Sequence, residues 1–449
     1  MNLKVLLTRL VGGGGLLALL TLATSGLFKI AAFAREAFIA SHFGLSSFTD
    51  AYFAFQQFPL ILCAFMFGAF SLAFTPAYAA EKRERRQVTW LPGLLFYGSM
   101  LGILLTLATV VLTPWLLPLF TSTPTAHGAG TVIILSCTFL PVIWLGIWAG
   151  TTIANGNNVW AMFMAGLPYL SMTVLLIGLY ALGRLDALSL PLSFLAGFGV
   201  VGAYTFVRIL ATECPKMDLR AMLETWRMPV FRRFLRQLTG SSIENLGYSA
   251  NQLLLVFFLA KAGTGAVSAN TCAMRVGMLG FTLLGQPLAQ LMQSKLCSAR
   301  PDALAEVFKK WLLAIGSVVL AFAAVLYLAR EPIVSLVYLH GKFSLVELKR
   351  VIEIVPAWVA YFVVSSLNAM VARYLFATAQ GSVYVRRQLF GYLAANAIRF
   401  AFWERLSAPM VIWCSVIAEG CALLLSLRSC FAPTETGLLK PEMAGVQEA

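Results

Sequence analysis

Residues 90–119 read WLPGLLFYGSMLGILLTLATVVLTPWLLPL and contain no charged side chain. A helix needs about 20 mostly apolar residues to cross the hydrocarbon core of a bilayer. This stretch is longer than that, and it lacks the alternation of apolar and polar residues that marks a barrel strand. It therefore predicts a membrane-spanning helix.

The rest of the chain has the same character. Of its 449 residues, 59% are apolar and only 12% are charged, and the mean hydropathy is +0.82. Soluble domains carry about a quarter charged residues, so this composition excludes a soluble globular enzyme. It also excludes intrinsic disorder, which requires low hydrophobicity. The eight cysteines form no C-x-x-C pair and the three histidines lie far apart, so we expect neither a metal site nor a cofactor.

Eleven further runs resemble residues 90–119. Together the twelve predicted spans lie at roughly 13–35, 51–79, 90–119, 131–154, 160–182, 188–210, 237–260, 272–294, 311–329, 351–376, 388–403 and 408–427.

The basic residues indicate how these spans are oriented, because cytoplasmic loops are enriched in Lys and Arg. With the N-terminus inside, the cytoplasmic connections 80–89 and 211–236 are strongly basic, whereas the outer connections 36–50 and 120–130 contain no Lys or Arg. The outer connection 330–350 is an exception to this pattern. The balance predicts that both termini are cytoplasmic. The net charge of +14 then reflects topology, and we expect no nucleic-acid partner.

The basic stretch 211–236 separates six spans from six. It divides the chain into an N-terminal lobe (1–210), a cytoplasmic linker, a C-terminal lobe (237–427) and a cytoplasmic tail (428–449).

The halves also resemble each other in sequence. Phe70-Ser71-Leu72 with Pro76 in the second span matches Phe281-Thr282-Leu283 with Pro287 in the eighth, at the same internal spacing. Transporters commonly bind substrate between such repeats. The predicted fold is all-α, with two six-helix lobes of parallel topology around a central cavity.

Several ionisable residues lie inside the predicted spans, where they are costly and usually face a cavity or a partner. Lys29 and Arg35 are in the first span, Glu244 and Asn251 in the seventh, and Arg275 near the start of the eighth. Asp50 opens the second span. For Arg208, Glu353 and Arg373 the better interpretation is snorkelling to the membrane surface; Arg399 and Glu419 are further candidates.

The deep cations come mainly from spans one and eight, one in each lobe. Cations that face a shared cleft suit an anion such as a pyrophosphate, because the Arg fork matches phosphate oxygens bidentately and Lys supplies a point charge. Lys29, Arg35 and Arg275 are therefore candidate pyrophosphate ligands. Glu244 is expected to balance the site, to bind a coupling ion or to form a salt bridge.

Three segments resemble the MurJ/MviN family, the lipid II flippases of the multidrug/oligosaccharidyl-lipid/polysaccharide exporter superfamily. The first comprises SGLFKIAAFAREAFIASHFG (25–44), FTDAYFAFQQFP (48–59) and FGAFSLAFTP (67–76), which are similar to the family patterns SRxxGFxRD, TDAFFxAFxxP and EGAFSxAFxP. The others are Ala273-Met274-Arg275, at the family's A-D-R, and EPIVSLVYLHGKFS (331–344).

The resemblance implies a flippase in which cavity cations bind the pyrophosphate of a lipid-linked sugar. By position, Lys29 replaces the first family arginine, and Arg35 and Arg275 match two others. Asp50 matches the family aspartate, and with Asn251 it is expected to support the site. Two features differ from the family. The family has two adjacent arginines in its second helix, and the corresponding position in this chain is near Cys63-Ala64, in apolar sequence. This chain is also expected to have twelve spans, whereas the lipid II flippases have fourteen. The implied substrate is thus an undecaprenyl-pyrophosphate-linked saccharide, either lipid II or an exopolysaccharide repeat unit.

Two alternatives remain open. The first is an ion-coupled exporter of small molecules or drugs on the same fold, which deep carboxylates in excess of deep cations would favour. The second is a membrane enzyme acting on lipid-linked glycans, which usually needs large outer loops with paired acids. Neither feature is present, so we expect a non-enzymatic transporter. Its expected partners are the lipid-linked saccharide and membrane lipids, with glycan-synthesis enzymes as candidate protein partners. No G-x-x-x-x-G-K-[ST] loop for ATP occurs in the chain.

Overall fold

The structure is a computed structural model that describes residues 15–85, 88–121, 126–214, 219–285, 303–378 and 380–431, together with Leu288, Ala289, Met292 and Leu296. Every regular element within these residues is a helix. Within these residues the helices follow the apolar runs of the sequence, so the predicted all-α architecture is confirmed.

The N-terminal half is built from long helices joined by short turns. Its elements are α2 (Gly15–Phe43), α3 (Ser47–Phe65), the π-helical turn η1 (Met66–Phe70), α4 (Ser71–Arg85), α5 (Leu91–Phe120), α6 (Ala126–Ser136), α7 (Phe139–Ala154), α8 (Asn158–Ala181) and α9 (Ser189–Thr212).

The C-terminal half follows after two short elements. Its elements are α10 (Leu219–Glu224), the 3₁₀ turn η2 (Thr225–Arg227), α11 (Pro229–Lys261), α12 (Ala266–Gly277), the π-helical turn η3 (Phe281–Gly285), α14 (Leu304–Leu328), α15 (Arg330–Tyr338), α16 (Leu345–Ala377), α17 (Gly381–Ala401), the 3₁₀ turn η5 (Trp403–Arg405) and α18 (Ala408–Phe431).

The helices have the length and surface of membrane spans. Among the described residues, eight helical stretches are long and apolar enough to cross a bilayer. The most apolar residues of α5 point outward, with Leu104, Val111 and Trp115 all exposed. Such an apolar surface is stable only against lipid or another protein. The chain is a multi-pass membrane protein.

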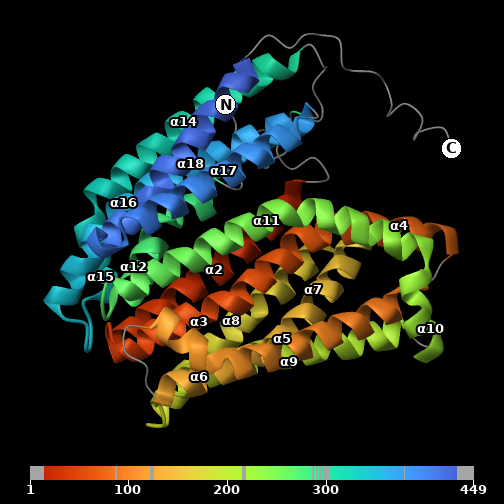
Figure 1. Cartoon of the computed structure of the whole chain (residues 1–449), viewed down its shortest axis with the longest axis horizontal. Coiled ribbons are helices and arrows are strands. Elements are labelled where there is room, and N and C mark those ends of the chain that lie inside the picture. The colour runs from red at the N-terminus through yellow and green to blue at the C-terminus, as the bar shows by residue number, and fades with distance from the viewer. Residues whose placement is uncertain are drawn as a thin grey trace.

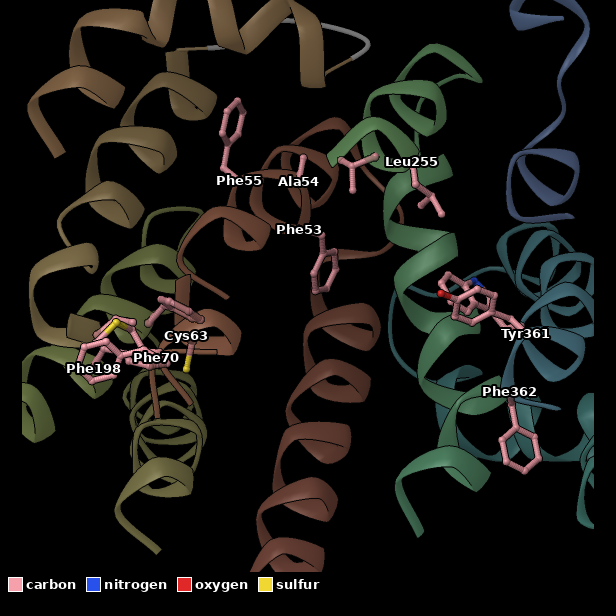
Figure 2. Packing of buried hydrophobic residues seen from close by; sticks show 14 of the residues in the cluster. Phe53, Ala54, Phe55, Cys63, Phe70, Phe198, Leu255, Tyr361 and Phe362 are labelled. Carbon is pink, nitrogen blue, oxygen red and sulfur yellow. The ribbon is translucent and has the colours of Figure 1, made fainter. Parts of the chain in front are cut away.

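The helices form two groups that meet at one end and diverge toward the other (Figure 1). Helices α2 to α9 make one group, and α14 to α18 make the other, with α11 and α12 between them. Buried side chains fill the interior of each group: Cys63, Phe70 and Phe198 lie together in the first, and Tyr361 and Phe362 lie on α16 in the second (Figure 2).

Helix α11 connects the two groups. Near its N-terminus, Phe234 is buried and stacks on Trp90 of the first group with ring centroids 5.4 Å apart. Near its C-terminus, Phe258 packs edge-to-face on Phe400 of α17 at 4.9 Å. The expected linker 211–236 contains α10, η2 and the first two turns of α11. Its residues Met222, Phe231 and Phe234 are buried, whereas Leu223 and Trp226 are exposed.

The similar segments of the two halves each overlap a π-helical turn. Residues Met66–Phe70 and Phe281–Gly285 each form a π-helical turn, and each lies within or beside the motif that relates the second and eighth spans. Such turns are rare and often occur at functional sites. The two turns differ in register, because the first ends at Phe70 and the second begins at the equivalent residue, Phe281.

One connection differs from the expectation. The connection 330–350, which the sequence predicts on the outer side, contains the helix α15 over Arg330–Tyr338, and α16 begins at Leu345. Val334 and Tyr338 of α15 are fully buried. The segment is helical because these apolar residues recur one helical turn apart and pack against the neighbouring helices.

Helix α9 approaches α7 closely at one glycine. A Cβ atom added to Gly202 would lie 2.7 Å from the Cα atom and 2.8 Å from the carbonyl oxygen of Pro141. One turn earlier, a Cβ atom added to Gly199 would meet nothing within 4 Å.

This pair generates a test of the packing. Gly202→Ala should lower the free energy of unfolding by about 1–3 kcal/mol, because the methyl group overpacks a backbone contact. Gly199→Ala is the matched control and should be neutral or stabilising, since alanine favours the helix. The measurement is thermal unfolding of both variants in detergent. Equal melting temperatures would contradict this helix packing.

Candidate functional site

Glu36 joins the two halves of the molecule through two arginines. Its Oε1 atom accepts hydrogen bonds from the NH2 groups of Arg35 at 2.8 Å and Arg275 at 2.7 Å. The Nε–H of Arg275 also donates to Glu36 Oε2. Because Arg35 and Glu36 are on α2 and Arg275 is on α12, the carboxylate bridges two cations from opposite halves.

The Arg35 guanidinium is enclosed by residues of the N-terminal half. Its side chain is inaccessible to solvent, and its NH1 group lies 3.4 Å from Met172 Sδ of α8. Its Cζ atom lies 5.6 Å from the ring centroid of Tyr169, a distance that permits a cation–π contact. Tyr52 of α3 is also fully buried and contacts Met172. Arg35 is therefore held between Glu36 of its own helix and the α8 residues Met172 and Tyr169.

Arg275 is the accessible member of the cluster. Its side chain is 32% exposed, whereas that of Glu36 is fully buried. The neighbouring α12 residues Cys272, Ala273 and Val276 are completely buried. The packed side of α12 thus anchors the helix, and part of the Arg275 side chain remains accessible from outside the protein interior.

The three side chains carry one unit of net positive charge. A buried carboxylate needs a cationic partner, and Glu36 has two. The second positive charge is not neutralised by any acid that bonds to these residues in the described part of the chain. An anion placed beside Arg275 would compensate it. We call Arg35, Glu36 and Arg275 the interlobe triad.

Asp50 lies outside the interlobe triad and bonds to the start of α12. It lies in the first turn of α3, and its carboxylate accepts hydrogen bonds from the backbone N–H groups of Gly265 and Ser268 at 2.5 and 2.8 Å. These groups begin α12, whose own cap residue, Gly265, has no side chain to offer. Asp50 therefore caps a helix of the opposite half. The Ser268 hydroxyl also lies 2.9 Å from Thr49 Oγ1.

A second set of contacts closes the same end of the molecule. Glu347 caps its own helix, α16, by accepting from the Ser344 N–H at 2.6 Å, and it also accepts from the Leu45 N–H at 2.6 Å. The Lys342 N–H donates to the Ser41 carbonyl at 2.7 Å. We call these contacts, together with those of Asp50, the end latch.

The remaining predicted site residues are placed as follows. Asn251 is fully buried in the C-terminal half, where its Oδ1 atom accepts from Arg399 and Asn396. The side chains of Lys29 and Glu244 lie outside the described residues. Cys63 occupies a buried position in α3. Of the proposed pyrophosphate ligands, Arg35 and Arg275 are brought together, with Glu36 between them.

Sequence reasoning missed Glu36 and Glu347 as functional residues. A signal for Glu36 was present, since it follows Arg35 directly and stands at the acid of the pattern SRxxGFxRD. For Glu347 the signal was only the capping-box spacing Ser344-x-x-Glu347, which predicts a helix start and not a contact with another helix.

Comparison with known proteins places this arrangement in a family. The two groups of helices and the charged cluster between them are features of a multi-pass membrane transporter. A family model described as lipid II flippase MurJ matches residues 39–425. The chain belongs to the MurJ family.

Curated relatives are similar at low identity. The chain is 26% identical over 349 residues to a lipid II flippase MurJ of Burkholderia cenocepacia, a match that covers 73% of this chain and 66% of the relative. It is 25% identical over 333 residues to a probable lipid II flippase MurJ of Buchnera aphidicola, covering 70% of this chain and 64% of the relative. The matches thus span about two thirds of the length of these relatives.

Solved structures have the same fold. A lipid II flippase MurJ in an inward closed conformation superposes with a TM-score of 0.78 at 17% identity, covering 92% of this chain and 87% of the other. An inward-facing multidrug resistance MATE transporter gives 0.71 at 16% identity, covering 94% and 99%. An outward-facing MATE transporter gives 0.60 at 17% identity, covering 92% and 94%.

The interlobe triad generates a stability prediction. Glu36→Gln should lower the free energy of unfolding by about 3 kcal/mol, because it leaves the buried Arg35 guanidinium without a counter-charge. Breaking a buried ion pair usually costs about 3–5 kcal/mol of stability. Because Arg275 is partly exposed, the expected decrease in the free energy of unfolding is near the lower end of that range.

The matched control is Glu353→Gln, the same change at an exposed position of α16, which should change stability by less than about 0.5 kcal/mol. Both variants are compared with the parent chain by thermal unfolding in detergent. Equal stability of the two variants would show that Glu36 does not carry the buried charge balance.

Proposed function

We propose that the chain is a flippase that moves an undecaprenyl-pyrophosphate-linked saccharide from the inner to the outer leaflet of the bacterial inner membrane. Lipid II is the first candidate, because the family model and the named relatives point to it. An exopolysaccharide repeat unit has the same pyrophosphate and is the second. The observation that carries the proposal is the excess positive charge of the interlobe triad, reachable at Arg275.

The triad has the donors that a pyrophosphate requires. Arg275 binds Glu36 with its Nε and NH2 groups, and its NH1 group makes no hydrogen bond within the described part of the chain. The Glu36 carboxylate therefore orients the guanidinium and leaves donors for phosphate oxygens. Charge-assisted hydrogen bonds of this kind are about twice as strong as neutral ones. In the conformation of this structure, Arg35 does not bind the ligand itself but positions Glu36, which in turn orients Arg275.

The arrangement of the two halves supports alternating access. The end latch joins α2 and α3 to α12 and α16, whereas the halves diverge at the opposite end (Figure 1). With both termini cytoplasmic, as the basic loops indicate, the latched end faces outward and the open end faces the cytoplasm. Export then requires the end latch to break while the triad holds the pyrophosphate.

This charge balance also separates the proposal from the alternatives. An exporter of cationic drugs would need an excess of acids at its binding site, whereas the triad has two cations for one acid. The other acids between the halves, Asp50 and Glu347, are bonded to backbone N–H groups of the end latch. For an enzyme, the described outer connections supply no pair of acids beside an open pocket. The proposed domain division keeps 1–210 and 237–427 as lobes, with the linker 211–236 and the tail 428–449 cytoplasmic.

Arg275→Ala should abolish translocation, since it removes the accessible phosphate donor. In proteoliposomes that contain fluorescent lipid II, the parent chain should expose the lipid to a quencher on the opposite side, and the variant should fall to the rate of empty vesicles. Arg405→Ala, an exposed arginine of η5, is the control and should keep the parent rate. Full activity of Arg275→Ala would remove the anion-site proposal.

Alternating access can be tested with a cross-link at the end latch. Because Thr49 Oγ1 and Ser268 Oγ lie 2.9 Å apart, the double variant Thr49→Cys, Ser268→Cys should form a disulfide between α3 and α12. Oxidation should then stop translocation, and a reductant should restore it.

The single variants Thr49→Cys and Ser268→Cys control for background thiols and should be insensitive to oxidant. Translocation at the parent rate by fully cross-linked protein would mean that this end does not open during transport.

A further inference from the structure

The C-terminal half contains a buried cation that the proposed transport cycle does not use. Arg399 lies in α17, two residues before the helix ends at Ala401, and it is 0% exposed. It is one of the largest fully buried side chains of the protein. An arginine is hardly ever buried to this degree without a paired acid, so its surroundings require an explanation.

Neutral oxygen atoms surround the guanidinium. Its NH1 group donates to Asn251 Oδ1 at 2.9 Å and Asn396 Oδ1 at 2.8 Å. Its Nε–H donates to the Val411 carbonyl at 3.0 Å, and its NH2 group donates to Ser415 Oγ. The four oxygens come from α11, α17 and α18. They include two amides, one backbone carbonyl and one hydroxyl.

No carboxylate belongs to this shell. Within the described residues, no acidic oxygen lies within 4 Å of the Arg399 nitrogens, and no group of three or more His, Cys, Asp or Glu side chains could hold a metal ion. The nearest acid along α18 is Glu419, one turn beyond Ser415, and its carboxylate accepts instead from the Tyr361 hydroxyl at 2.9 Å. The hydrogen bonds to the guanidinium therefore come from neutral dipoles alone, and the buried Glu419 carboxylate acts on its charge only at longer range.

A shell of neutral oxygens is characteristic of sites for hard monovalent cations. Carbonyl and hydroxyl oxygens replace the water around such an ion, and soft ligands are absent. The same four acceptors would be costly if the cation were removed, since buried oxygen atoms without partners each lose a hydrogen bond. The shell thus requires a cation at its centre.

We propose that Arg399 is a tethered cation: its guanidinium permanently fills an oxygen-lined monovalent-cation site formed by α11, α17 and α18. Because the cation is covalently part of the chain, it can neither leave nor exchange with sodium or potassium. The C-terminal half therefore keeps this site filled in every state, and alkali ions do not compete for it. Removing the guanidinium should create an alkali-cation site.

Thermal unfolding of the purified full-length protein in detergent tests this inference. The parent chain should melt at the same temperature in sodium chloride, potassium chloride and choline chloride at equal ionic strength. Arg399→Ala should melt at a lower temperature in choline chloride, and sodium or potassium should restore part of the loss in a saturable manner. Arg386→Ala removes an exposed arginine from the same helix and should show no ion-specific response.

A further variant identifies the ligands. Asn251→Leu combined with Arg399→Ala should lose the ion-dependent recovery, because it removes the acceptor that α11 contributes. An ion-specific, saturable rise in the melting temperature of the parent chain would overturn the proposal. The absence of any ion-specific recovery in folded Arg399→Ala would overturn it as well.

A second comparison avoids dependence on the alanine variant. Arg399→Lys and Arg399→Met have side chains of similar length, but only the lysine supplies a compact cation to the shell. Arg399→Lys should melt at a higher temperature than Arg399→Met, or be the only one of the two that folds. Equal or greater stability of the methionine variant would mean that the shell does not require a cation.

Discussion

The structure depends on one shared carboxylate. Glu36 balances the fully buried Arg35 on its own helix and reaches Arg275 on α12 of the other half. Without Glu36, two cations would face each other at the junction of the halves at a cost of several kcal/mol. With it, the junction is stable and still carries one uncompensated positive charge. The same side chain thus permits the two halves to associate and leaves the junction able to attract an anion.

Two types of contact hold the halves together, and they differ in how they can be broken. The end latch consists of backbone N–H groups bonded to Asp50 and Glu347, and water can replace these partners when the end opens. Arg35 and Glu36 of the triad are fully buried, so the charges of the triad can separate only if another charge replaces the lost partner. An incoming pyrophosphate could supply that charge at Arg275. The tethered Arg399 lies apart from both and keeps α11, α17 and α18 together as a unit.

Much of the fold was predictable because each membrane span carries its own signal. Apolar length alone placed α5, α8 and α9 within a few residues of their observed ends. The prediction was less accurate where short amphipathic segments gain stability by packing, as at α15 and at the start of α11. For the site, the sequence pointed to Arg35 and Arg275, but not to Glu36 as the group between them, because a charge pattern along one helix does not show which charges meet across two.

By itself, the sequence determined that this chain crosses a membrane many times. It also identified the ionisable side chains that are costly to desolvate within the spans, and the family to which its motifs are similar. These properties follow from composition and local order, since transfer into lipid is nearly additive along a helix. Only the tertiary structure decided that Arg275 shares an acid with Arg35, that Asp50 caps a helix of the opposite half, and that Arg399 is surrounded by oxygens without an acid. Each of these depends on where helices far apart in sequence come within hydrogen-bonding distance, and that is settled by packing in three dimensions.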